Sequence, residues 1–182
     1  MVFFLGAVLA GERQAAVPAF TPIGSATVKL MLFVPVPVCL SILYCVENAL
    51  VAAELTGVRR TVAYDQVAIV VAGGLAQVGA ALGKLLVHAP TAQAAGRNVL
   101  FLTGLMLASR ALLGPIGAGV VCVGWLVLVT LVGYGGDLRP YAWTVVLRNP
   151  NDVMSGLVSC VMFAVGVGLM RNSRGMKAIG AT

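Results

Sequence analysis

Five long apolar runs, separated by short polar segments, make up most of this chain. They are Val28–Ala53, Val67–Val87, Arg97–Leu113, Ile116–Tyr134 and Val153–Met170. An α-helix rises about 1.5 Å per residue, so runs of this length are suited to a bilayer core of about 30 Å. The pattern predicts an all-α fold, a polytopic integral membrane helical bundle of about five spanning or re-entrant helices.

The apolar pattern leaves no stretch long enough for a soluble domain of ordinary size. We therefore predict a single transmembrane domain over residues 1–182. Within it, residues 1–27 form a membrane-border segment, 28–171 the helical bundle and 172–182 a basic tail.

Helix breakers interrupt two of the apolar runs. Pro35 and Pro37 lie in the first run and remove two backbone donors, which predicts a bend there. Gly114 and Pro115 separate the third run from the fourth. This break makes residues 97–134 the natural place for a re-entrant piece.

The charges that flank the last run indicate an orientation. Arg171, Arg174 and Lys177 follow it with no acidic residue to balance them, which predicts a cytoplasmic C-terminus by the positive-inside rule. The side of the N-terminal polar segment, Gly11–Thr27, then depends on the number of crossings. It lies outside if all five runs span the membrane, and inside if one run is re-entrant.

Composition supports the membrane assignment. The chain is 60% apolar and 10% charged, with a mean hydropathy of +1.00, whereas soluble domains average about 45–50% apolar and about 25% charged residues. Its formal net charge of +6 fits basic loops and tails that face anionic lipid headgroups. No basic run with interleaved aromatic residues is present, so we expect no nucleic-acid partner.

Residues that carry catalysis are scarce. The single histidine, His88, lies at a membrane border, and the acidic residues are few and far apart. The four cysteines lie inside apolar runs without a CxxC pair, which is typical of packing residues. We therefore expect neither enzymatic activity nor a cofactor, metal site or disulfide framework.

Glu47 is the sharpest candidate for a functional residue, with Tyr44 and Asn48 beside it in the first run. A charged acid at such depth costs about 2.5–3.5 kcal/mol on insertion scales. Glu47 could belong to a substrate or proton path, form an ion pair with Arg110, or face water near a helix end. Arg110 could form that pair, or mark the end of a short helix before Gly114.

The second run is rich in small residues. Gly79 and Gly83 form a GxxxG pair, which lets another helix approach closely. We predict a helix-packing surface at these two positions.

The N-terminal region resembles a known family. Gly11-Glu12-Arg13, then Thr21-Pro22, Lys29 and a proline-bearing span, are similar to the cytoplasmic coupling segment of ABC-2 type transporter permeases. The GAALGK sequence at 79–84 and the turn at 92–96 also fit this family, whereas its leucine-rich core is replaced by AAVPAF at 15–20.

The resemblance implies a small permease-like subunit in a bacterial cell membrane. ATP would be hydrolysed on a cytoplasmic ATPase partner, with Glu12, Arg13 and Lys29 as the coupling residues. Glu47 and Arg110 would line the substrate path, with Tyr44 and Asn48 near them. The alternative is a non-catalytic accessory subunit of a larger membrane complex, which the lack of reactive clusters and the GxxxG face favour.

Overall fold

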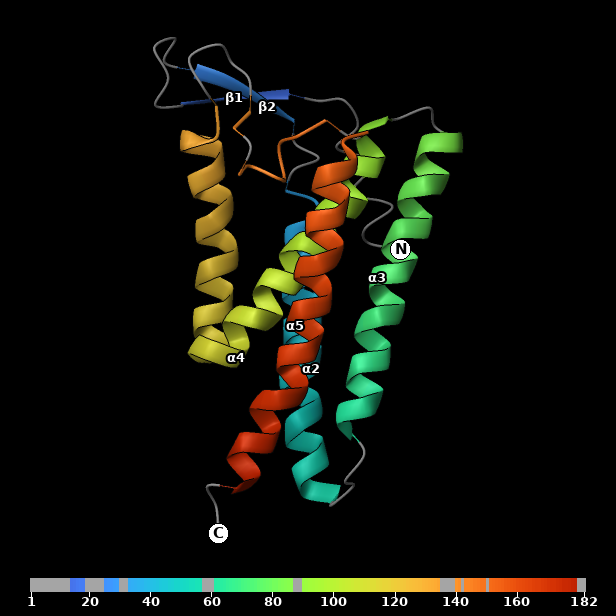
Figure 1. Cartoon of the computed structure of the whole chain (residues 1–182), viewed down its shortest axis with the longest axis vertical. Coiled ribbons are helices and arrows are strands. Elements are labelled where there is room, and N and C mark those ends of the chain that lie inside the picture. The colour runs from blue at the N-terminus through green and yellow to red at the C-terminus, as the bar shows by residue number, and fades with distance from the viewer. Residues whose placement is uncertain are drawn as a thin grey trace.

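In a computed structural model of the chain, a bundle of helices carries a two-stranded sheet at one end (Figure 1). The structure describes the backbone of residues 14–18, 25–29, 33–56, 61–86, 90–134, 140–141, 143–149 and 151–179. Side chains are described within 33–48, 64–85, 92–134, 140–141, 143–149 and 151–170. The elements are β1 (Gln14–Pro18), β2 (Ser25–Lys29), α2 (Pro35–Thr56), α3 (Thr61–Leu86), α4 (Pro90–Val132) and α5 (Val153–Ile179).

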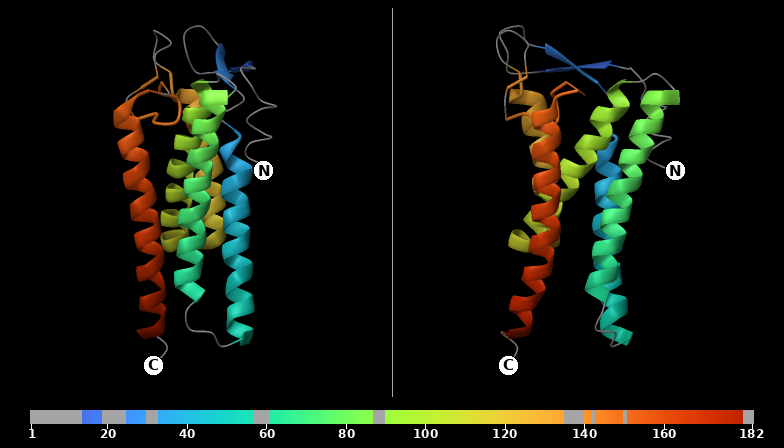
Figure 2. Two further views of the ribbon diagram at one scale, coloured as in Figure 1. Left: turned by 90° about the vertical axis from the view of Figure 1, so that its right-hand side faces the viewer. Right: turned by 45° about the vertical axis from the view of Figure 1, so that its right-hand side comes forward.

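The path of the chain through the bundle is simple. Strands β1 and β2 pair in antiparallel fashion, with Gln14 opposite Lys29. From the sheet end α2 runs away, α3 returns, α4 goes partway down and back, and α5 runs to the far end (Figures 1 and 2). The sheet and the last turn of α5 therefore lie at opposite ends of the bundle.

The start of the first apolar run differs from the prediction. Val28 and Lys29 belong to β2, and α2 begins only at Pro35. Pro35 and Pro37 thus occupy the first turn of a helix, where the backbone amides have no intrahelical partner in any case. The predicted bend at these prolines was wrong, because they start the helix rather than interrupt it.

The predicted break at Gly114 is present. The two apolar runs on either side of it form one long element, α4, in which Gly114 has φ 80° and ψ −178°. Such a φ favours glycine, and the extended ψ suits a residue that precedes proline. The backbone reverses at this point, so α4 is a helical hairpin whose two ends lie at the sheet end of the bundle (Figure 1).

The chain is membrane-embedded. Three of the described helical stretches are long and apolar enough to cross a bilayer: Tyr64–Leu85, Ala92–Val132 and Val153–Met170. The described apolar part of α2, Pro35–Asn48, is shorter. Five separate spans are therefore not confirmed, and the third and fourth apolar runs share one hairpin.

The hairpin also changes the expected topology. A re-entrant element was expected to bring the N-terminal segment and the C-terminal tail to one side. Both halves of α4 turn back together, however, so the described chain begins at the sheet end of the bundle and α5 finishes at the other end (Figure 2). The two ends of the described chain therefore lie on opposite faces of the bundle.

The first half of α4 is the centre of the fold. It packs against α2, α3 and α5, and most of its side chains between Ala92 and Ser109 are buried. Leu102 and Met106 have no exposed surface, and Val99 and Leu107 have almost none. The other helices keep large apolar side chains on their outer faces, as expected where lipid replaces water.

Small residues set the helix crossings. On α3 the buried positions recur at spacings of four and three residues, as Ile69, Gly73, Ala76, Ala80 and Gly83. A Cβ at Gly83 would lie 3.0 Å from the Cβ of Ala92, so α3 and α4 approach closely at this position. Gly79 is half-buried and lies beside this stripe rather than in it.

The closest crossing lies between α4 and α5. A Cβ at Gly104 would come within 2.5 Å of the carbonyl carbon of Met162, and one at Gly166 within 2.9 Å of the Cα of Gly104. The two backbones are therefore in direct contact there, which only glycine allows.

Candidate functional site

An ion pair joins α2 to the hairpin. The Nε of Arg110 donates to the Oε1 of Glu47 over 2.6 Å, although the two residues are 63 positions apart in sequence. The side chain of Arg110 is 14% exposed and that of Glu47 is 36% exposed. Of the alternatives open from sequence, the structure shows the ion pair.

The pair lies near the tip of the hairpin. Arg110 precedes Gly114 by one helical turn, and the tip stops short of the far ends of α2 and α5 (Figures 1 and 2). A charge pair within a membrane bundle is costly to desolvate and commonly marks a substrate or ion pathway. Its position beside a broken helix adds to that interest, because broken helices form many transporter binding sites.

The other two residues expected in the path lie elsewhere. Tyr44 is 71% exposed and Asn48 is also exposed, so both face outward from α2. Asn48 directly follows Glu47 and therefore points in a different direction, whereas Tyr44 lies one helical turn before Glu47 but is exposed rather than enclosed with the ion pair. The structure therefore brings together Glu47 and Arg110 but not Tyr44 and Asn48.

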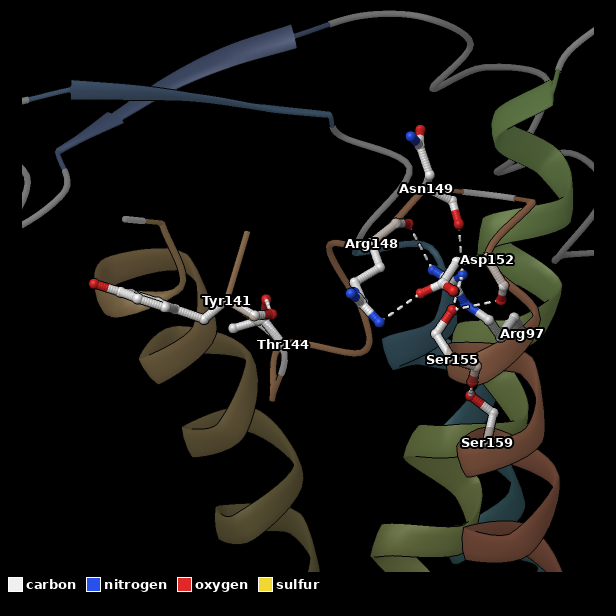
Figure 3. Close-up of polar contacts among 8 residues, drawn as sticks. All are labelled: Arg97, Tyr141, Thr144, Arg148, Asn149, Asp152, Ser155 and Ser159. Carbon is white, nitrogen blue, oxygen red and sulfur yellow. Dashed lines mark hydrogen bonds and ion pairs between the residues drawn. The ribbon is translucent and has the colours of Figure 1, made fainter. Parts of the chain in front are cut away.

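A second polar cluster, at the sheet end, centres on Arg97 (Figure 3). Its Nη1 donates to the carbonyl of Asn149 at 2.8 Å and to the Oγ of Ser155 at 2.6 Å. Its Nη2 donates to the carbonyl of Arg148 at 2.8 Å. Arg97 is only 6% exposed, so it fastens the segment before α5 to the first half of α4 from inside the protein.

The neighbours of Arg97 reinforce this clamp. The side-chain amide of Asn98 donates to the carbonyl of Val146 over 3.1 Å. Arg148 and Asp152 form an ion pair at 2.8 Å next to the contacts of Arg97 (Figure 3). Because most of these acceptors are backbone carbonyls, the cluster positions the chain and offers little reactive chemistry.

Sequence reasoning missed this cluster. Arg97 stood at the boundary of an apolar run, where a basic residue usually faces headgroups. The adjacent Asn98 was a usable signal, because two polar residues on a buried helix need partners within the protein.

The proposed coupling residues are only partly within the described structure. Lys29 ends β2 opposite Gln14, at the sheet end of the bundle. Glu12 and Arg13 lie outside the described residues, as does His88. At the same end Lys84, in the last turn of α3, donates to the side-chain oxygen of Gln93 over 2.8 Å.

The four cysteines are free. Cys39 and Cys122 are buried in the core, whereas Cys45 and Cys160 are exposed on the outer faces of α2 and α5. Cys39 and the hydroxyl of Thr103 are 3.5 Å apart. Among the residues that the structure describes, no group of three or more His, Cys, Asp or Glu side chains could hold a metal ion.

Comparison with protein-family models, with curated proteins and with solved structures found no match to this chain in any of the three.

Proposed function

We propose that this chain is a small permease-like subunit of an ATP-driven membrane transporter, in which Glu47 and Arg110 line the substrate path. The observation that carries the proposal is their ion pair at the tip of the α4 hairpin. A paired acid and base within a membrane bundle can open to admit a polar group and close again behind it. Alternating access would then involve movement of the hairpin relative to α2.

We infer the side on which the ATPase would bind from the positive-inside rule. The sheet, with Lys29, and the end of α5 lie at opposite ends of the bundle, so both cannot face the cytoplasm. We place the cytoplasm at the end of α5, because Arg171, Arg174 and Lys177 follow its apolar part. The last turn of α2 and the first turn of α3 lie at this same end (Figure 1). Arg59 and Arg60 come between these two helices in the sequence.

This orientation assigns the ATPase contact to the basic end. The segment with Glu12, Arg13 and Lys29 would then face outside and could not couple to ATP hydrolysis. The coupling role that the family resemblance implies for it requires the reverse orientation, with the end of α5 outside.

The test is extraction in mild detergent followed by co-purification. We expect an ATPase in stoichiometric amount, whose rate of ATP hydrolysis falls several-fold with Glu47→Gln or Arg110→Gln in this chain. Asn48→Ala is the matched control, because it alters the residue next to Glu47 on the exposed face of α2. Absence of an ATPase, or equal hydrolysis in all three variants, would exclude the transporter function.

One observation favours the alternative, an accessory subunit. Buried Arg97 and partly buried Arg110 already have partners inside the chain, Arg97 with carbonyls and Arg110 with Glu47. An accessory subunit predicts that Glu47→Gln leaves the activity of the complex intact. It also predicts that Gly83→Leu, which disturbs the contact of α3 with α4 inside the chain, lowers the amount of the chain assembled into the complex.

A further inference from the structure

We propose that Arg110 recognises the anionic group of an amphiphile, a carboxylate or phosphate carried on an apolar tail. This inference rests on the proposed function, because it names the substrate class for the same ion pair. It is carried by three observations: the geometry of the Arg110–Glu47 contact, its partial exposure and the apolar surface beside it.

The contact with Glu47 uses only part of the guanidinium. An arginine has five N–H donors, and among the described side chains the contact engages the one on Nε. The edge formed by Nη1 and Nη2 matches a carboxylate or phosphate through two parallel hydrogen bonds. The contact with Glu47 therefore does not use the Nη1–Nη2 edge, which is the edge best suited to an anion.

Comparison with Arg97 shows what an arginine with a purely structural role looks like here. The two Nη atoms of Arg97 donate to two carbonyls and a hydroxyl, and the residue is 6% exposed. Arg110 has one described contact, and its partner Glu47 keeps 36% of its side chain exposed. The Glu47–Arg110 pair is thus partly exposed, whereas Arg97 is buried among its hydrogen-bond acceptors.

The surface beside Arg110 is apolar. Leu112 is 77% exposed, Leu113 64% and Ile116 85%, all within six residues of Arg110 at the hairpin tip. In a bilayer such side chains contact acyl chains. A ligand that reaches Arg110 along this surface keeps its apolar tail in contact with it, which favours an amphiphile over a small hydrophilic anion.

Glu47 then has a defined role in recognition. Its carboxylate is the counter-ion of Arg110 when no ligand is bound, and its negative charge weakens the attraction of Arg110 for an anion at the Nη1–Nη2 edge. Removing its charge strengthens ligand binding, and removing Arg110 weakens it. A purely structural ion pair would give no such opposite pair of effects.

The experiment measures binding to the isolated chain in phosphatidylcholine nanodiscs, by the shift of its unfolding temperature. Dodecyl phosphate and dodecanoate are the probes, and inorganic phosphate is the hydrophilic comparison. We expect the two amphiphiles to stabilise the chain and inorganic phosphate to have no effect. Affinity should fall about tenfold or more in Arg110→Gln, since hydrogen bonds to charged groups have that strength.

Three further variants sharpen the result. Glu47→Gln should bind the amphiphiles more tightly than the native chain. Arg110→Lys keeps the charge but lacks the two-donor edge, and should bind with intermediate affinity. Arg148→Gln removes an arginine whose side chain lies outside this site, and should bind as the native chain does.

The outcomes separate the possibilities. Binding that is unchanged in Arg110→Gln, or weakened in Glu47→Gln, would overturn the proposal. If phosphatidylglycerol in the nanodisc abolishes the effect of the probes, the ligand is a lipid headgroup, and if it does not, the ligand is a free amphiphile. Because no ATPase is present, this binding can fail while transport holds, or hold while the ATPase proves absent.

Discussion

Two arginines of the first half of α4 show how surroundings decide the role of a residue. Arg97 is enclosed by backbone carbonyls and Ser155, whereas Arg110 meets one carboxylate at a partly exposed position. Both lie in an apolar run, and a hydropathy profile treats them alike. Only the partners supplied by α2 and by the segment before α5 distinguish a structural clamp from a candidate binding residue.

Replacing Arg97 should destabilise the protein. Arg97→Gln removes the three described hydrogen bonds and leaves buried acceptors without partners, which costs at least about 1.5–3 kcal/mol. Thermal unfolding followed by size-exclusion chromatography measures the loss. Arg148→Gln is the control, because it breaks a partly exposed ion pair of about 0.2–1 kcal/mol and leaves the Arg148 carbonyl in place. Equal stability of the two variants would contradict the clamp.

The Glu47–Arg110 pair can be measured by a double-mutant cycle with Glu47→Gln and Arg110→Gln. We expect a coupling of about 1 kcal/mol in unfolding free energy, because the contact is direct but Glu47 is partly exposed. Glu47→Gln combined with Arg148→Gln should show no coupling. Additive losses for Glu47 and Arg110 would mean that the two residues do not interact in the membrane.

At the scale of the elements, glycines determine how closely the helices approach and where α4 turns. Gly104 and Gly166 bring the backbones of α4 and α5 into contact, and at Gly114 the chain reverses direction to form the hairpin. The sequence predicted the break at Gly114, because Gly-Pro is a strong local signal. The Gly104–Gly166 crossing had no comparable signal, since many glycines of this chain lie in similar apolar surroundings.

The crossing can be tested within one helix. Gly166→Ala would place a Cβ against the backbone of Gly104, and should destabilise the chain by about 1–3 kcal/mol through overpacking. At Gly168, two residues further along α5, nothing lies within 4 Å of the added Cβ. Gly168→Ala should therefore keep the native unfolding temperature or raise it slightly. An equal loss of stability in both variants would mean that alanine destabilises this part of α5 for a reason other than the contact with Gly104, which would contradict the prediction.

The hairpin turn depends on backbone conformation alone. Nothing lies within 4 Å of a Cβ added at Gly114, but its φ of 80° is strained for alanine by about 1–3 kcal/mol. Gly114→Ala should lower the unfolding temperature, whereas Gly119→Ala, in a helical position with open space, should not. The same thermal assay compares them, and a stable Gly114→Ala would argue against the left-handed turn.

At the scale of the whole molecule, the placement of the sheet and the end of α5 at opposite ends of the bundle has a direct consequence for labelling. Ser25→Cys in β2 and Asn151→Cys before α5 should react with a membrane-impermeant thiol reagent from one side, and Ser173→Cys from the other. Each of these variants is made in a protein from which the two exposed native cysteines, Cys45 and Cys160, have been removed.

The labelling has an internal control in Leu157→Cys. This position is exposed on the apolar part of α5, and should stay unlabelled from both sides because lipid covers it. Reaction of Ser25→Cys and Ser173→Cys from the same side would contradict the hairpin topology. If Ser173→Cys reacts from the cytoplasm, the N-terminal coupling role implied by the family resemblance is excluded.

The sequence by itself determined that this is a helical membrane protein, where two of its spans lie and where α4 breaks. Those features depend on hydrophobicity and turn chemistry that are local in the chain. Tertiary structure decided which polar groups meet: Glu47 with Arg110 across 63 positions, and Arg97 with residues 51 to 58 positions away. It also decided that the sheet and the end of α5 face opposite sides, because both halves of α4 turn back together. Such pairings follow from how helices pack against one another, which local patterns along one chain do not record.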